Sequence, residues 1–372
     1  MYNIILTISF LVATVALILS CIAFVKHYPE YFENQEEKRL FFSSELFIDV
    51  LPNTRYVLLG ESTHGTDEFY LIRESITEHL IQNNGFNCIL LEIEWSIGRL
   101  FNKFVQNTES DESAREFLVK TCVKFPKWMW RNIHIKNLLE FVREFNRNSA
   151  QKVSIYGVDC QDLELARKEF NTSCNNQTTF ECSIVKKIIE NHSQMVRKNY
   201  WNRRDTTWYE IIEKLLDQHK CDKFILWAHN SHIGNASCYE DNVDVSHINI
   251  GYLLRKALQK MKEKYSVLTI GFVTGTGTVR AAKSWGGEGQ IMTINDPLKN
   301  SYEEFFKEIF KDRNINIYKC DKSRNLHKLF RYIGVIYNKN NEKKSHYKYT
   351  NIDCEFDYII YIHKTTALDL LN

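Results

Sequence analysis

Short apolar runs alternate with longer segments of helical periodicity along most of the chain. Between the first two runs, one helical face is apolar and consists of Phe69, Ile72, Ile76, Leu80 and Ile81. Apolar strands that alternate with amphipathic helices predict an α/β fold, with a mixed or largely parallel central sheet flanked by helices. The predicted strands cover residues 55–60, 87–93, 153–156, 224–228, 267–273, 334–337 and 358–362.

The periodicity also predicts how the chain is divided. A long helix-rich stretch covers residues 162–219, between two predicted strands, and indicates a helical insertion. No run rich in proline, glycine or serine separates one part of the sheet from another. We therefore expect residues 40–372 to form a single domain, preceded by a charged juxtamembrane segment at residues 28–39.

The N-terminal segment has a different pattern, because residues 4–25 are apolar and carry no charge. At about 1.5 Å per residue, a helix of this length just spans a bilayer core of about 30 Å. A cleaved signal peptide is the alternative, but its apolar region usually has only about 7–15 residues and follows basic residues. No Lys or Arg precedes this run. We predict that residues 1–27 form the transmembrane anchor of a single-pass membrane protein, and its orientation stays open.

Charge and cysteine content narrow the possible functions. The 372 residues have a formal net charge of +2, which argues against a nucleic-acid partner bound through a basic surface. The ten cysteines include no C-x-x-C pair, so neither a thioredoxin-type site nor a zinc ribbon is indicated. Cys174 and Cys182 are close enough in sequence to form a disulfide if the domain lies in an oxidising compartment.

Polar side chains follow directly after four of the predicted strands. In open α/β sheets, ligands bind outside the carboxyl ends of parallel strands. Each of these residues also has an ordinary structural interpretation, and only their convergence on one edge argues for a site. The residues expected to converge are Glu61, His64, Glu92, Asp159, His229, Asn230 and His232.

The residue types point to acid–base chemistry. His64 is the candidate general base, because an imidazole titrates near pH ~6.5. Glu61 or Glu92 could orient it and stabilise its protonated form. Asp159 is expected to contact the substrate.

A second group of side chains could assist the reaction. His229 and His232 are three residues apart, so they could meet on one helical turn and polarise a carbonyl oxygen or orient water. Asn230, between them, is expected to contact the substrate. Arg73 falls on the helix after the first loop, where it could hold a substrate oxyanion or lock a carboxylate.

Other chemistries have weaker support. Three histidines and two glutamates could supply the ligands of a zinc site, but the H-E-x-x-H spacing is missing. There is no G-x-S-x-G nucleophile elbow and no P-loop. We therefore expect neither a metal nor another cofactor, while a metal-dependent hydrolase of another bond remains an alternative.

Beyond these patterns, the chain resembles the erythromycin-esterase-like family from about residue 55 to its end. The resemblance implies an α/β core with a helical part and hydrolysis of a carboxylic ester or macrolactone. A histidine would activate water directly, without an acyl-enzyme. The segments that carry the resemblance, in this order, are LLGESTHGTDEFYLIRESIT, GFNCILLEIEW, SIYGVDCQD, YWNRRD, FILWAHNSHIGNAS, INIGYLLRKAL, LTIGFVTGTGTVRAA, YIGVIYNKNNEKKSHY and EFDYIIYI.

The resemblance also implies roles for single residues. His64 matches the family's base, and Glu61, Arg73 and Glu92 fall on its essential polar positions. His229 and His232 match its second histidine cluster. The expected partners are a small-molecule ester and, through the N-terminal helix, a membrane. The alternative to an enzyme is a catalytically inactive, membrane-tethered binding domain.

Overall fold

The computed structural model describes Ile48 and residues 50–174, 179–194, 199–218, 221–239, 247–260, 264–311 and 313–372. The predicted anchor at residues 1–27 and the juxtamembrane segment at residues 28–39 lie outside these residues. Among the described residues, no helix is both long enough and apolar enough to cross a membrane.

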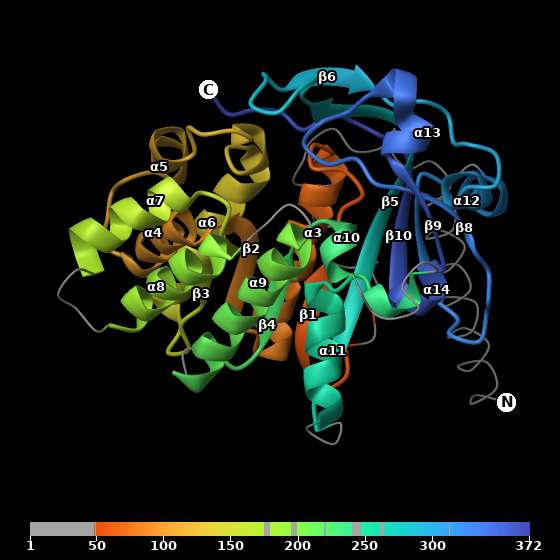
Figure 1. Ribbon diagram of the computed structural model, residues 1–372. Coiled ribbons are helices and arrows are strands. Elements are labelled where there is room, and N and C mark those ends of the chain that lie inside the picture. The colour runs from red at the N-terminus through yellow and green to blue at the C-terminus, as the bar shows by residue number, and fades with distance from the viewer. Residues whose placement is uncertain are drawn as a thin grey trace, which may run out of the picture.

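An eight-stranded mixed sheet forms the centre of the domain (Figure 1). The strand order is β3-β2-β4-β1-β5-β10-β7, and β6 pairs with β5. The strands from β3 to β10 are parallel, whereas β7 and β6 pair antiparallel with their neighbours. Their bounds are β1 (Thr54–Leu59), β2 (Cys88–Glu94), β3 (Ser154–Asp159), β4 (Phe224–Trp227), β5 (Ser266–Ala281), β6 (Gln290–Thr293), β7 (Ile315–Lys319) and β10 (Tyr358–Thr365). A separate two-stranded sheet pairs β8 (Lys328–Arg331) with β9 (Tyr347–Thr350).

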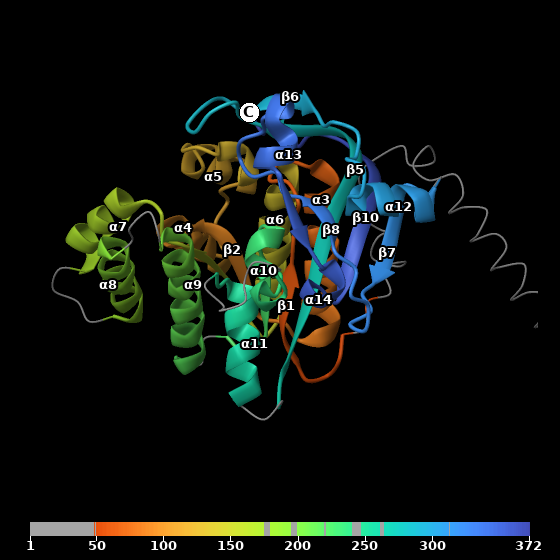
Figure 2. The same cartoon turned by 45° about the vertical axis from the view of Figure 1, so that its right-hand side comes forward.

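Helices cover both faces of the sheet, as predicted (Figures 1 and 2). Alternate side chains of β1 enter two different apolar clusters, with Val57 and Leu59 in one and Tyr56 and Leu58 in the other. The first cluster includes side chains of α3 (Asp67–Asn84), α4 (Trp95–Gln106), α5 (Ala114–Thr121) and α6 (Ile133–Asn148). The second includes side chains of α8 (Phe180–Ser193), α9 (Tyr200–Asp217), α11 (Ile250–Lys260) and α12 (Tyr302–Phe310).

Short helices complete the described structure. The helical insertion predicted between β3 and β4 is present and contains α7 (Leu163–Glu169), the π-helical η2 (Phe170–Cys174), α8 and α9. The remaining elements are η1 (Lys127–Met129), α10 (Asn230–Ile233), η3 (Ala236–Cys238), η4 (Lys339–Asn341), α13 (Glu342–Ser345) and α14 (Ile352–Glu355).

Local sequence explains why α3 has these bounds. Asp67 and Glu68 lie in its first turn, where negative charge complements the helix dipole. Gly85 ends the helix with φ 70°, a left-handed conformation that glycine adopts without steric penalty. Phe69 and Ile72 are fully buried on the face that packs against the sheet. This packing also brings Arg73 to the edge of the sheet where β1 ends.

Among the residues that the structure describes, three disulfides connect parts of the domain. The bridge between Cys174 and Cys182, which the sequence left open, is formed. Two others, Cys88–Cys221 and Cys238–Cys354, were not predicted, because their partners lie 133 and 116 residues apart in the sequence.

One strand prediction was wrong. Residues 334–337 form no strand but an irregular segment, with an isolated bridge between Ala282 and Ile336. The apolar side chains there are accommodated in a loop that packs against the chain after β1. Directly before it, the backbone N–H of Ile333 donates to the carbonyl of Ser62 at 2.7 Å. The apolar run therefore closes one side of the predicted site instead of extending the sheet.

Candidate active site

The four predicted polar loops meet at one edge of the sheet because their strands are parallel and in register. Leu59 at the end of β1 pairs with Trp227 at the end of β4, and Trp227 also aligns with Leu91 in β2. At the far side, Glu94 of β2 aligns with Asp159 of β3. The expected convergence is therefore confirmed, and the residues after these strands form one buried polar group.

Glu61 and His64 face each other in the loop after β1. His64 Nδ1 lies 2.8 Å from Glu61 Oε1, and the other carboxylate oxygen accepts a hydrogen bond from Arg73 Nη2 at 2.8 Å. All three side chains are buried. An ionised carboxylate can only accept, so Nδ1 carries the proton in this pair. The remaining ring nitrogen, Nε2, is then the basic one.

The guanidinium of Arg73 is not a free cation, because it is already engaged by neighbouring side chains. Its guanidinium lies over the rings of Tyr70 and Trp227, 4.3 and 4.7 Å from their centroids. Two roles were predicted for this arginine, to hold a substrate oxyanion or to lock a carboxylate. Its ion pair with Glu61 matches the second role. The guanidinium thereby fixes the position of the Glu61 carboxylate.

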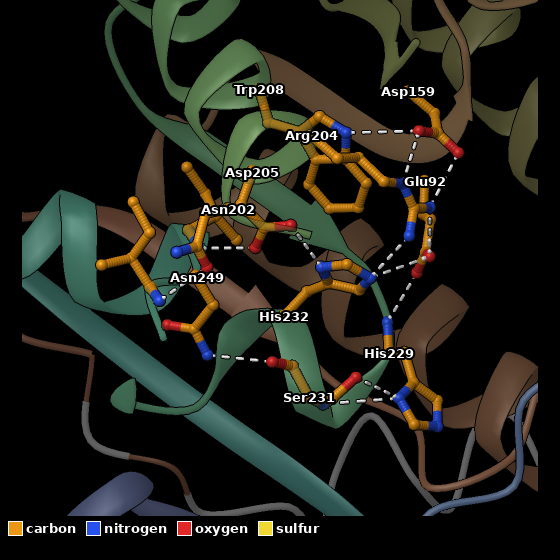
Figure 3. Close-up of polar contacts among 12 residues, drawn as sticks. Glu92, Asp159, Asn202, Arg204, Asp205, Trp208, His229, Ser231, His232 and Asn249 are labelled. Carbon is orange, nitrogen blue, oxygen red and sulfur yellow. Dashed lines mark hydrogen bonds and ion pairs between the residues drawn. The ribbon is translucent and has the colours of Figure 1, made fainter. Parts of the chain in front are cut away.

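Glu92 connects β2 to the loop after β4 and to α9. Its Oε2 accepts the backbone N–H of His229 at 2.8 Å, and its Oε1 accepts Arg204 Nη2 at 2.9 Å (Figure 3). Burial alone would raise the pKa of Glu92, but electrostatic interactions with His232, His64 and Arg204 hold it well below its ordinary value. Glu92 is therefore an ionised anchor for the start of α10.

His229 presents a neutral imidazole beside His64, with the two ring centroids 4.9 Å apart. Burial and the neighbouring His64 hold its pKa well below the ordinary value. Its Nδ1 accepts the backbone N–H of Ser231, so the proton of the neutral ring belongs on Nε2. That buried Nε2 lies near the carbonyl of Ser62 but has no hydrogen bond of normal geometry within the described residues.

His232 is held in a denser network. Its Nδ1 lies 2.8 Å from Asp205 Oδ1 and its Nε2 lies 3.4 Å from Glu92 Oε1. Burial lowers the pKa of His232, but these two carboxylates outweigh burial and raise it to about 9. Arg204 Nη1 lies 3.0 Å from Nε2, a contact that becomes a hydrogen bond only when the ring is neutral. The ring also stacks on Trp201 at 4.2 Å.

Arg204, for which no sequence pattern predicted a role, is the centre of this network. Its Nε and Nη2 donate to the two oxygens of Asp159, each at 2.8 Å, and Nη2 also reaches Glu92 (Figure 3). Burial alone would lower the pKa of Arg204, but the charges of Asp159 and Glu92 overcome burial and raise it. The RRD triplet that contains it was part of the family resemblance, but its sequence did not show that α9 passes over the ends of β2 and β3.

The two predicted substrate contacts are occupied by protein groups. Both carboxylate oxygens of Asp159 bind Arg204. Asn230 is fully buried and exchanges two hydrogen bonds with the backbone of Phe272, donating from Nδ2 at 2.8 Å and accepting at Oδ1 at 3.2 Å. Asn230 thus ties α10 to β5.

A cation at this site would meet carboxylates that are already paired with arginine. In the part of the chain that the structure describes, the donor atoms of Glu61, His64 and Glu92 lie within 4.8 Å of one another. However, Arg73 already neutralises Glu61, and Arg204 neutralises Glu92. Two guanidinium charges beside the same carboxylates oppose the binding of a divalent ion.

Comparison with known proteins shows the family to which the chain belongs. Residues 81–179 and 169–365 match the erythromycin esterase family, so the chain belongs to that family. A curated relative, the erythromycin esterase type II of Escherichia coli, is 26% identical over 110 residues, which are 30% of this chain and 24% of that protein. The chain thus matches about a quarter of the length of that relative.

Solved structures show the same fold. A succinoglycan biosynthesis protein has a TM-score of 0.64 at 15% identity, covering 92% of this chain and all of the other. A Bacillus cereus protein has a TM-score of 0.65 at 15% identity, with the same coverage. A mutant of the erythromycin esterase EreC in its open conformation has a TM-score of 0.61 at 14% identity, covering 93% of this chain and 97% of that one.

Proposed function

We propose that the protein is a membrane-anchored hydrolase of carboxylic esters or macrolactones, in which His64 activates water as a general base. The observation that carries the proposal is the buried chain from Arg73 through Glu61 to His64 Nδ1. This chain fixes the ring tautomer and leaves Nε2 as the acceptor for a proton. The family supports an ester as the substrate class.

The reaction begins with proton transfer from water to His64 Nε2. The water oxygen attacks the ester carbonyl carbon, and the carbonyl π electrons move to the carbonyl oxygen. His229 Nε2–H donates a hydrogen bond to that oxygen and stabilises its negative charge. Its depressed pKa suits this role, because a neutral donor does not repel the imidazolium that forms on His64.

The second half of the reaction returns the proton. The tetrahedral intermediate collapses, the bond between carbon and the alcohol oxygen breaks, and His64 gives its proton to the leaving alcohol. Glu61 stabilises the imidazolium between the two steps, through the bond it already makes to Nδ1. Acid and alcohol are the products, and one water is consumed.

The other polar residues position these two rings. Glu92 holds the backbone of His229, and Arg204 holds Glu92 through its bidentate bond to Asp159. His232 contributes a positive charge beside Glu92. We therefore assign Asp159 a positioning role in place of the substrate contact expected from the sequence, and Asn230 the same kind of role.

The test is hydrolysis of aryl esters and macrolides by the full chain in detergent. His64→Asn should abolish turnover of every ester that the wild type hydrolyses. His79→Asn, an exposed position on α3, is the matched control and should leave turnover unchanged. Equal turnover by wild type and His64→Asn would refute the assignment of the base.

A metal-dependent hydrolase is the second candidate, favoured by the proximity of Glu61, His64 and Glu92. Chelation separates the two. Turnover that survives prolonged dialysis against a chelator supports direct activation of water by His64. Turnover that is lost and then restored by added zinc supports the metal site.

A further inference from the structure

An apolar surface lies at the rim of the active-site edge, and we call it the rim surface. It comprises Val123, Trp285 and Ile291, which are 62%, 67% and 61% exposed. Val123 belongs to the segment between α5 and η1, and the other two belong to the turn and strand that follow β5. Exposed apolar side chains that gather beside a site mark an interaction surface more often than isolated ones do.

The rim surface adjoins the loop after β1 that contains His64, residues 60–66, which we call the catalytic loop. Arg280 near the end of β5 donates its backbone N–H to the carbonyl of Gly65 at 2.9 Å, and Gly65 follows His64. Ala282, a little further along the chain, donates to the carbonyl of Val335 at 2.8 Å. Figure 2 shows the connection between β5 and β6 extending above α5, at the upper edge of the molecule.

Contacts between aromatic rings hold Trp285 in place on the rim surface. The ring of Phe125 lies 5.2 Å from Trp285 and 5.4 Å from Trp128, both in edge-to-face contact. Trp128 is buried against Gly289, where a side chain larger than hydrogen would collide with the indole. Trp285 is thus held on one edge while most of its ring faces outward.

The chemistry of the surface fits a phospholipid bilayer. Indole rings favour the headgroup level of a membrane, where one side is apolar and the other is hydrated. Residues 122–127 and 282–290 carry three lysines and one carboxylate, which favours lipid phosphates; Lys124 also pairs with Asp162. In the proposed function the apolar run at residues 4–25 is a membrane anchor, which would keep the domain close to the same bilayer.

We propose that the rim surface rests on the membrane and turns the active-site edge toward it. This inference deepens the proposed function and rests on it, because it makes esters of membrane amphiphiles the substrate class. Such an ester would reach His64 from the bilayer across the β5–β6 connection without crossing bulk water.

Fluorescence of the full chain in vesicles containing brominated phospholipids tests the contact. The chain has seven tryptophans, and Trp285 is the one among them with a largely exposed ring. Bromine should therefore quench a fraction of the emission that disappears in Trp285→Ala and persists in Ile309→Ser, an exposed control on α12. Equal quenching of wild type and Trp285→Ala would overturn the proposal, as would a signal that depends on protein density and reports self-association.

An activity measurement separates this inference from the proposed function. Trp285→Ala combined with Val123→Ser should reduce turnover of a vesicle-borne ester by roughly tenfold, given the apolar area removed. Turnover of a water-soluble aryl ester should stay unchanged. Equal loss on both substrates, or on neither, would overturn the lipid-surface proposal. Absence of turnover in the wild type would instead count against the esterase assignment, while the quenching would still test the contact.

Discussion

Replacing Glu61 with glutamine tests the tautomer argument most severely, because it changes one charge without changing the size of the side chain. The carboxylate accepts from His64 Nδ1 and from Arg73 Nη2, both at 2.8 Å. An amide has only one acceptor oxygen, so it cannot satisfy both donors. The guanidinium cannot become an acceptor, and the amide oxygen will therefore face Arg73. The amide NH₂ then faces His64 Nδ1.

The expected magnitude follows from this geometry. With Nδ1 forced to accept, the ring proton moves to Nε2, and the lone pair that should take a proton from water is lost. In the catalytic triad of serine proteases, the corresponding acid-to-amide change lowers kcat by about 10⁴ because the histidine adopts the wrong tautomer. We expect Glu61→Gln to lower kcat by about 10²–10⁴, with a much smaller change in KM.

The assay is steady-state hydrolysis of an aryl ester by the full chain, beside a thermal unfolding curve. Glu140→Gln, a partly exposed position on α6, is the matched control and should retain full activity. A folded Glu61→Gln protein with kcat within about threefold of the wild type would refute the reasoning, because the tautomer would then not depend on the carboxylate.

Three further outcomes are expected. Burial lowers the pKa values of His232 and His134, but the neighbouring carboxylates outweigh burial and raise both pKa values to about 9. Each protonated histidine should therefore stabilise the fold fully below pH ~6.5, and this stabilisation should be lost as the pH rises through 9. Each contribution is at most about 3 kcal/mol, and unfolding curves that are flat between about pH 6 and 10 would contradict it. Arg204→Lys should lower kcat at least about tenfold, because lysine cannot form the bidentate bond; normal activity would exclude a positioning role. Replacing both Cys88 and Cys221 with alanine removes a link across 133 residues and should destabilise the fold by up to about 5 kcal/mol in chemical denaturation, whereas unchanged stability would show that the link is not formed.

The sequence was most informative where periodicity and topology act together. Apolar runs predicted the parallel strands β1 to β5 and β10 and the helical stretches between them. The rule for parallel sheets then placed Glu61, Glu92 and His229 at one edge. Side chains at strand ends can be located in this way because parallel strands run in the same direction, and their carboxyl ends therefore lie at the same edge of the sheet.

The parts that could not be predicted depend on contacts between distant segments. Arg204 reaches Asp159 only because α9 packs over β3, and the sequence of α9 does not indicate that Asp159 is its partner. Residues 334–337 have the composition of a strand, yet they form an irregular segment that packs against the catalytic loop. This packing depends on contacts between segments that are distant in the sequence. Asn230 carries a polar group typical of substrate contacts, but both of its donor and acceptor functions are used by the backbone of Phe272.

Pre-steady-state hydrolysis of an aryl ester tests the central claim, that His64 activates water without a covalent intermediate. Direct attack by water predicts linear release of the phenol from the first turnover, and no turnover in His64→Asn. A burst of phenol stoichiometric with the enzyme would show an accumulating acyl-enzyme and would contradict direct attack by water.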